Sequence, residues 1–459
     1  MLRRDLVRIL GLTLTAATGL SAQESYAVFQ PPPRLLLSED RLRLLRREFE
    51  RRNDRWRQLE MLLQGGAPFP EPVFAHALGH LASSDESLAR KAFEALRDNT
   101  SPHEVALLYD WCGEALSSSQ RDTLQQRLRA VLNQPLAKDA PVTVARNITM
   151  AAIAMSDDAP EESAKALGRV HQTWWPGVHE RIRNGKIPFP HTEALPFVEI
   201  LYSFQRGLQL DLRESAISFF RDYPIWHLLR HYPPSLAGGE NDYRIPAFSG
   251  GGEPNVDDAV RSRAAELAMV ALDTNAPESQ YLQGWLLNPR FRMRSMLGAP
   301  YEYFWCNPYQ PSLSYFYLPL YQHLPKFGTL LIRSSWEENA LWLGEVDGAL
   351  QLFTEEGIRI MQFAPANRTL QLGPSTVVLE GTQNREDSWS IAEAPECERV
   401  FWLGLKPSAR YELEIDGEEL TEADASPDGV LEINFENRGQ GSVAIRPRGR
   451  GADQASQAE

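Results

Sequence analysis

The stretch HLPKFGTLLIRSSWEENALWLGEVDG, residues 323–348, marks the place where the hydrophobic period of the chain changes. Before it, from Pro33 to about His323, apolar residues recur at the spacing of amphipathic helices. After it, they alternate with polar residues in short runs separated by Gly, Pro, Asn and Asp, as in β-strands. The sequence therefore predicts a helical domain at residues 23–325, followed by a β-sandwich at residues 326–448.

The helical half contains two clear helix starts. Ser101-x-x-Glu104 and Ser117-x-x-Gln120 both match the capping box, and the short connection between the two helices predicts a hairpin. Further helices are expected at residues 144–155, 161–174, 192–206, 212–230 and 256–272. Repeated helical hairpins bury their apolar faces by stacking in a ring or a solenoid. Because no strict sequence period is present, we expect a toroid rather than a regular repeat array.

The first residues, MLRRDLVRILGLTLTAATGLSAQES, have the organisation of a cleavable export signal. A basic start precedes an apolar run from Ile9 to Leu20, and the small residues Ser21 and Ala22 follow. The paired arginines match either a twin-arginine signal or an ordinary secretory one. We therefore expect a signal at residues 1–22 and a periplasmic or secreted protein. No run is long and apolar enough to predict a membrane span.

The charge and the cysteines of the chain limit the partners and sites that the sequence predicts. The net charge is −14, which gives the chain no general attraction for nucleic acid. Cys112, Cys306 and Cys397 are odd in number and far apart, so they predict neither a disulfide framework nor a metal site. We expect no cofactor and no metal. The polar tail, residues 449–459, is expected to be disordered.

Three stretches resemble the heparinase II/III-like and alginate-lyase-like polysaccharide lyases. Residues 33–60, PRLLLSEDRLRLLRREFERRNDRWRQLE, are similar to the opening helix of that family, and residues 107–124, LLYDWCGEALSSSQRDTL, to its first hairpin. Residues 327–348, FGTLLIRSSWEENALWLGEVDG, are similar to the strand pair at which its sandwich begins. The resemblance implies an incomplete (α/α) toroid carrying an antiparallel β-sandwich. It also implies β-elimination on an acidic polysaccharide, a carbon-oxygen lyase activity.

The resemblance also implies a catalytic pair. Such lyases use a base to remove the proton on C5 of a uronic acid, an acid to protonate the oxygen leaving C4, and polar groups to neutralise the carboxylate. In these lyases a His or Asn on a toroid helix works with a Tyr about fifty residues later. Here His191 and Tyr243 are 52 residues apart. His191 is the expected base or neutraliser, and Tyr243 the expected acid or base.

Two sequence contexts bear on this pair. His191 lies in IPFPHTEALPFVEILYSF, residues 187–204, at the start of a predicted helix, where an isolated histidine is more often a surface or buried residue than a base. Tyr243 lies in a stretch rich in Gly and Pro, residues 231–255, which we expect to be a long structureless loop with a functional role.

Other residues are weaker candidates for binding the sugar. Arg244 and Asn241 would grip the carboxylate. Glu193 matches an acidic partner near the histidine, and Asn147 matches an inner-helix amide of the family, although a helix-start or buried amide explains Asn147 equally well. Flat aromatic faces suit sugar rings, but aromatic clusters also form cores. The aromatic candidates for a cleft rim are Trp174, Trp175, Tyr303 and Trp305.

The chain departs from the family at one point and leaves two alternatives open. Relatives present a histidine from the sandwich, whereas this chain has no histidine after His323, which also removes support for the structural metal of some relatives. A glycoside hydrolase on the same toroid would use a carboxylate pair, with Glu240, Asp242 and Glu253 as candidates. The third interpretation is a catalytically inactive glycan-binding protein.

Overall fold

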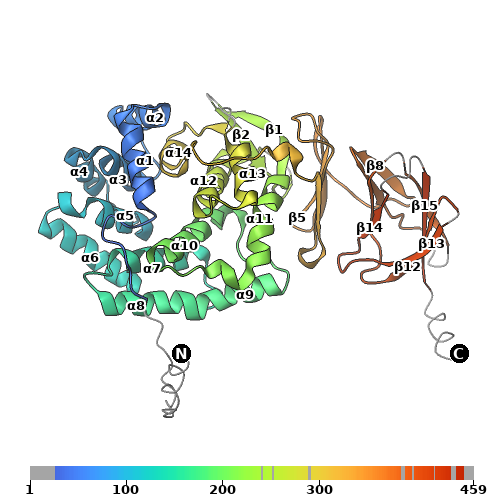
Figure 1. Ribbon diagram of the computed structural model, residues 1–459, viewed down its shortest axis with the longest axis horizontal. Helices are drawn as coiled ribbons and strands as arrows, with labels where there is room; N and C mark the ends of the chain where they lie inside the picture. Colours follow the sequence, from blue (N-terminus) through green and yellow to red (C-terminus); the bar gives the residue numbers. More distant parts are fainter. Residues whose placement is uncertain are drawn as a thin grey trace, which may run out of the picture.

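A helical domain precedes a set of β-sheets (Figure 1). The computed structural model describes residues 26–238, 241–250, 253–287, 291–383, 388–394, 397–417, 419–435 and 441–448. The expected signal and tail, and Glu240, lie outside these ranges. In the described ranges, no helix has both the length and the hydropathy needed to cross a membrane.

The first half of the helical domain contains seven helices among the described residues. They are α1 (Glu39–Glu50), α2 (Asp54–Gln64), α3 (Pro72–Ser83), α4 (Glu86–Glu94), α5 (Pro102–Cys112), α6 (Ser118–Leu132) and α7 (Val142–Ala154). The second half continues with α8 (Pro160–Arg169), α9 (Trp175–Arg183), α10 (Ala194–Gly207), α11 (Ile217–Leu229), α12 (Val256–Leu272), α13 (Pro277–Leu286) and α14 (Gly298–Trp305).

One of the two predicted capping boxes is present. At the start of α6, the Ser117 hydroxyl accepts from the Gln120 backbone, and the Gln120 side chain accepts from Ser117. At the start of α5, Ser101 makes no capping hydrogen bond. The Glu104 carboxylate instead accepts from the backbone N–H of Phe74 on α3, at 3.3 Å. A contact between two helices therefore replaces the local cap that the sequence predicted.

Six of the helices contact one another in sequence, and the last of the six contacts the first. α3 contacts α5, α5 contacts α7, α7 contacts α10, α10 contacts α12, α12 contacts α14, and α14 contacts α3. We call these six helices the inner helices. The others lie against them, with α4 on α3, α6 on α5, α8 on α7 and α13 on α12. Their buried apolar side chains form one continuous core.

The predicted structureless loop is wrong for residues 231–246, which form a β-hairpin. β1 (His231–Gly238) pairs antiparallel with β2 (Asn241–Pro246), and Leu236 lies opposite Tyr243. The hairpin forms because Tyr243 and Ile245 alternate into the core, as the residues of one strand face do.

The C-terminal half contains three sheets among the described residues. The first has the order β3 (Tyr321–Leu324), β4 (Thr329–Arg333), β5 (Trp342–Val346), β6 (Ala349–Thr354) and β7 (Gly357–Ile360). The second has the order β14 (Leu431–Asn434), β11 (Arg399–Leu403), β9 (Ser375–Leu379) and β8 (Arg368–Leu372). The third has the order β10 (Ser390–Ala394), β15 (Gly441–Pro447), β12 (Arg410–Ile415) and β13 (Glu419–Asp424).

The sheets stack in three layers rather than the two of the predicted sandwich (Figure 1). In β4, Leu331 packs into the helical core, while its neighbours Leu330 and Ile332 pack against the second sheet. The opposite face of the second sheet, including Val378 and Trp402, packs against the third. Pairing is antiparallel except between β9 and β11, which are parallel. A helical domain followed by largely antiparallel sheets is thus confirmed.

Hydrogen bonds fix the first sheet to the helical domain. Tyr232 in β1 donates to the Gln351 side chain in β6 at 2.7 Å, and Gln351 donates to the backbone carbonyl of Phe248 at 2.8 Å. Trp342 in β5 donates to the backbone carbonyl of Leu229 at 2.7 Å. The sheet therefore holds the end of α11 and the hairpin that follows it.

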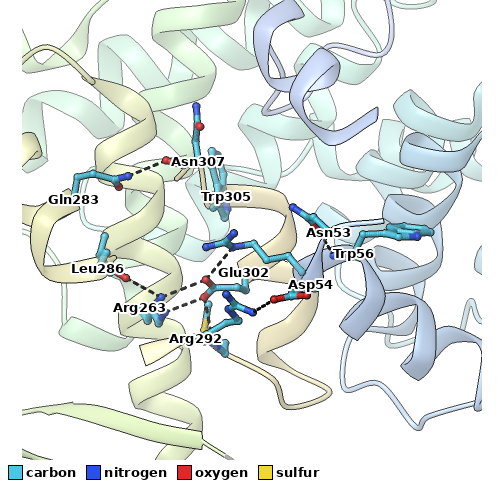
Figure 2. Close-up of polar contacts among 12 residues, drawn as sticks. Asn53, Asp54, Trp56, Arg263, Gln283, Leu286, Arg292, Glu302, Trp305 and Asn307 are labelled. Atoms are coloured by element: carbon cyan, nitrogen blue, oxygen red, sulfur yellow. Dashed lines mark hydrogen bonds and ion pairs between the residues drawn. The ribbon is translucent and has the colours of Figure 1, made fainter. Parts of the chain in front are cut away.

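Within the helical domain, a buried ion-pair network joins α14 to α12 and α2 (Figure 2). The Glu302 carboxylate accepts from Arg263 at 2.9 and 3.3 Å and lies 3.5 Å from Arg55. Glu302 also accepts from the backbone N–H of Met293, at 3.2 Å. These contacts lower the pKa of Glu302 even though burial alone would raise it.

Candidate functional site

The inner helices meet at their N-terminal ends. Glu193, immediately before α10, accepts from the backbone N–H and the hydroxyl of Thr143 in the first turn of α7, at 3.4 and 3.2 Å. Tyr301, in the first turn of α14, donates to Glu71, immediately before α3. Because each contact joins two helix starts, we place these N-termini at one end of the set of inner helices.

His191 belongs to this end. It begins a short 3-10 turn, His191–Glu193, that leads into α10, and its side chain is half-buried. Burial lowers the pKa of His191, and Arg230 at the end of α11 lowers it further. Asp258 and Asp347 act in the opposite direction. The imidazole is therefore neutral at neutral pH and can accept a proton.

A cavity of about 210 Å³ lies between α11 and the first sheet. Its charged lining residues are Arg230, Glu345 and Asp347, and its apolar walls include Trp226 and Leu331. Among the residues that the structure describes, no carboxylate lies within ion-pairing distance of Arg230. Two of these charged residues, Arg230 and Asp347, also act on the pKa of His191. The cavity and His191 thus belong to one region that contains an unpaired guanidinium.

Tyr243 lies in a second, smaller cavity. The ring is 7 % exposed and lines the cavity together with Glu266, Trp285 and Phe291. The free volume is about 10 Å³, which is close to the size of one water molecule. Tyr243 is therefore adjacent to a buried carboxylate but is covered by its own hairpin.

The expected carboxylate clamp beside Tyr243 has other contacts. The Arg244 guanidinium donates to the backbone carbonyl of Pro233, lies 4.3 Å from the centre of the Phe291 ring, and is 3.6 Å from Glu338. The Arg244 guanidinium is therefore occupied by contacts with its own hairpin and with Phe291 and Glu338. The backbone of Asn241 pairs with Gly238, whereas its side chain lies outside the described part of the chain.

A buried polar cluster that the sequence analysis missed lies between these regions. His227 in α11, His231 in β1 and Glu266 in α12 are 4 %, 2 % and 1 % exposed. Glu266 Oε1 is 2.7 Å from His227 Nε2 and 3.1 Å from His231 Nε2. The hydroxyl of Ser262 donates to the same oxygen at 3.1 Å. We call these four residues the His-Glu cluster.

The His-Glu cluster connects the two expected catalytic residues. His227 acts electrostatically on His191, and Glu266 lines the cavity that contains Tyr243. His191 and Tyr243 therefore each lie near a member of the same cluster. The sequence contains one signal for it, the four-residue spacing of His227 and His231, which on a helix would place both side chains on one face, although His231 begins β1. Glu266 comes 35 residues later and carries no local signal.

The four aromatic candidates lie in the core rather than on a cleft rim. Their side chains are 0–4 % exposed. Trp174 donates to the Ala140 carbonyl at 2.9 Å, and Tyr303 to the Leu45 carbonyl at 2.6 Å. Trp175 donates to the Ser215 hydroxyl at 3.1 Å, and the Trp305 side chain is 1 % exposed. Burial of such large apolar rings stabilises the helical domain but leaves no face for a sugar.

Asn147 and Glu193 also have structural partners. The Asn147 side-chain oxygen accepts from Arg146 at 3.2 Å, and Arg146 pairs with Glu199 at 3.3 Å. Glu193 binds Thr143, as described above. Burial raises the pKa of Glu199 to about 7.

A second buried carboxyl lies near this end of the inner helices. Burial and the nearby Glu71 raise the pKa of Glu104 to about 7. Of the loop carboxylates, Asp242 lines the Tyr243 cavity and Glu253 is exposed. The two carboxyls whose pKa is raised to about 7, Glu104 and Glu199, therefore come from helices, not from the loop that the sequence favoured.

Comparisons with known proteins give low similarity. No family model and no curated protein matches the chain. A solved structure described as a glycoside hydrolase has 10 % identity and a TM-score of 0.30, covering 93 % of this chain and 79 % of that chain. Heparan sulfate lyase HepC from Pedobacter heparinus has 13 % identity and a TM-score of 0.36, covering 82 % of this chain and 75 % of that chain. Values this low establish no activity, so a functional proposal depends on the residues described above.

Proposed function

We propose that this protein is an exported polysaccharide lyase that cleaves a polymer containing uronic acids by β-elimination. The observation that carries the proposal is that Arg230, which lines the 210 Å³ cavity, lies near enough to His191 to lower its pKa. A neutral imidazole can take a proton, and a guanidinium can hold a carboxylate in a bidentate fashion. β-Elimination on a uronate needs both groups at one place.

Each residue then has a definite role. Arg230 binds the uronate carboxylate and stabilises the negative charge that develops when C5 loses its proton. His191 accepts that proton through its neutral ring. Arg230 thereby takes the neutralising role that the sequence analysis gave to Arg244, whose guanidinium holds the hairpin.

Tyr243 is the proposed acid for the oxygen that leaves C4. A phenol O–H is a hydrogen-bond donor and can pass its proton to a leaving oxygen. Since the ring is 7 % exposed, this role requires the β1–β2 hairpin to uncover it when substrate binds. The ring of inner helices with sheets on one side would then be the incomplete (α/α) toroid and sandwich of the family that the sequence resembles.

The proposal is tested by the ultraviolet absorbance of the product, because elimination leaves a C4–C5 double bond conjugated to the carboxylate. The purified chain is incubated with a panel of uronate polymers, alongside His191→Ala and the control His179→Ala. We expect the absorbance to rise with one polymer, and to rise at the same rate with the control variant. The rate should be about 10²–10⁴-fold lower with His191→Ala. Equal rates for His191→Ala and the wild type would reject His191 as the base.

A glycoside hydrolase is the second candidate, and one observation favours it. Glu104 and Glu199 are carboxyls with a pKa of about 7, as a general acid requires. Both are buried, at 5 % and 3 % exposure, which places them further from solvent than His191. This candidate would be selected if the polymer is cleaved without the ultraviolet absorbance of a double bond, and if Glu104→Gln or Glu199→Gln abolishes that cleavage. Binding without cleavage would select the inactive glycan-binding protein.

A further inference from the structure

The His-Glu cluster brings several metal-ligating atoms together around one point. One ligand atom from each of His227, His231 and Glu266 lies within 4.8 Å of the other two. Glu266 Oε1 is 2.7 and 3.1 Å from the two Nε2 atoms. The Ser262 hydroxyl lies 3.1 Å from that oxygen and 3.3 Å from His227 Nε2. Two imidazoles and a carboxylate form a ligand set typical of zinc.

The orientation of His231 leaves its Nε2 facing Glu266, as a metal ligand would. Its Nδ1 lies 2.9 Å from the backbone carbonyl of His227. Because a carbonyl can only accept, Nδ1 carries the hydrogen, and the Nε2 of a neutral ring presents a lone pair to Glu266 Oε1. Two acceptors facing each other at 3.1 Å repel unless a proton or a metal cation lies between them. A histidine that binds metal through one nitrogen commonly donates the other N–H to a carbonyl in this way.

The spacing of the ligand atoms suits a bound ion. Ligands about 2.0–2.2 Å from zinc lie roughly 3.0–3.6 Å from one another. The separations of 2.7 and 3.1 Å from Glu266 Oε1 therefore need only small outward shifts of the side chains. The cavity of about 10 Å³ beside Glu266 has room for one water as a further ligand.

The arginines that line the cavity beside the cluster are paired with carboxylates. Arg263 lines the same cavity, but its guanidinium is turned toward Glu302 (Figure 2). Arg244 is 3.6 Å from Glu338, and Asp242 contributes a carboxylate to the cavity lining. Arg263 and Arg244 therefore have carboxylate partners of their own, whereas a third arginine, Arg333, donates to the backbone carbonyl of His231 at 3.4 Å.

We propose that His227, His231 and Glu266 hold a zinc ion, with Ser262 or a water as the fourth ligand. The site is closed, since its ligands are at most 4 % exposed, so the ion has a structural role. It fastens the end of α11 and the start of β1 to α12, and so fixes the root of the β1–β2 hairpin. This inference does not depend on the proposed function.

The test measures the metal content and unfolding temperature of the full chain. Protein purified with Zn²⁺ and then dialysed should retain one zinc per chain, and prolonged treatment with a strong chelator should lower its unfolding temperature, which added Zn²⁺ restores. His227→Gln and Glu266→Gln should bind zinc at least about tenfold more weakly. His179→Gln, which removes a histidine outside the cluster, should bind as the wild type does.

A measurement on the unaltered chain keeps the inference testable if these variants do not fold. Co²⁺ added to the chelator-treated protein should give the visible absorption of a tetrahedral site at one equivalent, and Zn²⁺ should displace it. Wild-type protein that retains no zinc and gives no such band would overturn the inference. Equal zinc binding by the wild type and both cluster variants would do the same.

Discussion

Trp342 in the first sheet donates its indole N–H to the backbone carbonyl of Leu229, the last residue of α11, at 2.7 Å. The next residues along the chain are Arg230, which lines the 210 Å³ cavity, and His231, which belongs to the His-Glu cluster. One hydrogen bond from the sheet therefore holds the backbone directly before Arg230 and His231.

Trp342→Phe should lower the free energy of unfolding by more than Trp226→Phe does. Trp342 and Trp226 are both buried and lose the same volume, but the Trp226 N–H meets no acceptor in the described part of the chain. The difference should be about 1–3 kcal/mol, because Trp342→Phe leaves the Leu229 carbonyl without its donor. Denaturant unfolding monitored by circular dichroism measures it. Equal losses would show that the hydrogen bond adds no stability.

A second prediction concerns the contact between the first and second sheets. His323 in β3 is 3.1 Å from Asp428 and 3.7 Å from Glu432 in β14. Burial opposes the charged ring, but these two carboxylates outweigh it and raise the pKa of His323 to about 9. The stabilisation is therefore fully present below pH 6.5, the unfolded value, and is lost as the pH rises through about 9.

The size of this effect is up to about 3 kcal/mol. His323→Gln should lower the denaturant midpoint strongly at about pH 6 and hardly at all at about pH 10. His80→Gln serves as the control for a histidine outside this contact. A loss that is the same at both pH values would contradict the raised pKa.

The pH dependence of activity tests His191. Asp347 raises the pKa of His191, against the larger lowering effects of burial and Arg230. Asp347→Asn should therefore lower this pKa, so that the acidic limb of the kcat/KM profile moves to lower pH. Asp347 has a φ of 50°, a conformation that asparagine also tolerates, so the turn should survive the change. If the acidic limb does not move, or moves to higher pH, His191 is not the group whose titration controls the rate.

The buried network of Figure 2 gives a stability prediction. Glu302→Gln removes the charge that pairs with Arg263 and Arg55, at 2.9 and 3.5 Å. An uncompensated buried guanidinium should cost about 3–5 kcal/mol of unfolding free energy. Glu356→Gln, which breaks an exposed pair with Arg359, should change stability little. Calorimetric unfolding of both variants provides the measurement.

Most of the secondary structure could be predicted because its signals are local. The capping box at Ser117 and Gln120 appears in the structure. Strands replace helices near the predicted boundary at Lys326, although β3 already begins at Tyr321. Strands β3, β10 and β13 have few alternating apolar residues and therefore give a weak strand signal in the sequence. The hairpin at residues 231–246 was missed because its prolines and glycines resemble loop signals, while its pairing depends on packing against the first sheet.

The candidate site was less predictable because its residues meet only in the folded chain. The position of His191 at a helix entrance was visible in the sequence. Trp174 and Tyr303 looked like sugar-binding aromatics, since a sequence does not show which side of a helix faces the core. Glu266 meets His227 and His231 through helix packing alone, so no local pattern predicts the His-Glu cluster.

The mass of the reaction product tests the central claim most directly. A uronate polymer is incubated with the chain in water labelled with heavy oxygen, and the fragments are weighed by mass spectrometry. β-Elimination at His191 predicts an unsaturated fragment that is lighter than the hydrolysis product by one water and carries no label. A saturated fragment that has gained one labelled oxygen would contradict β-elimination and identify a hydrolase.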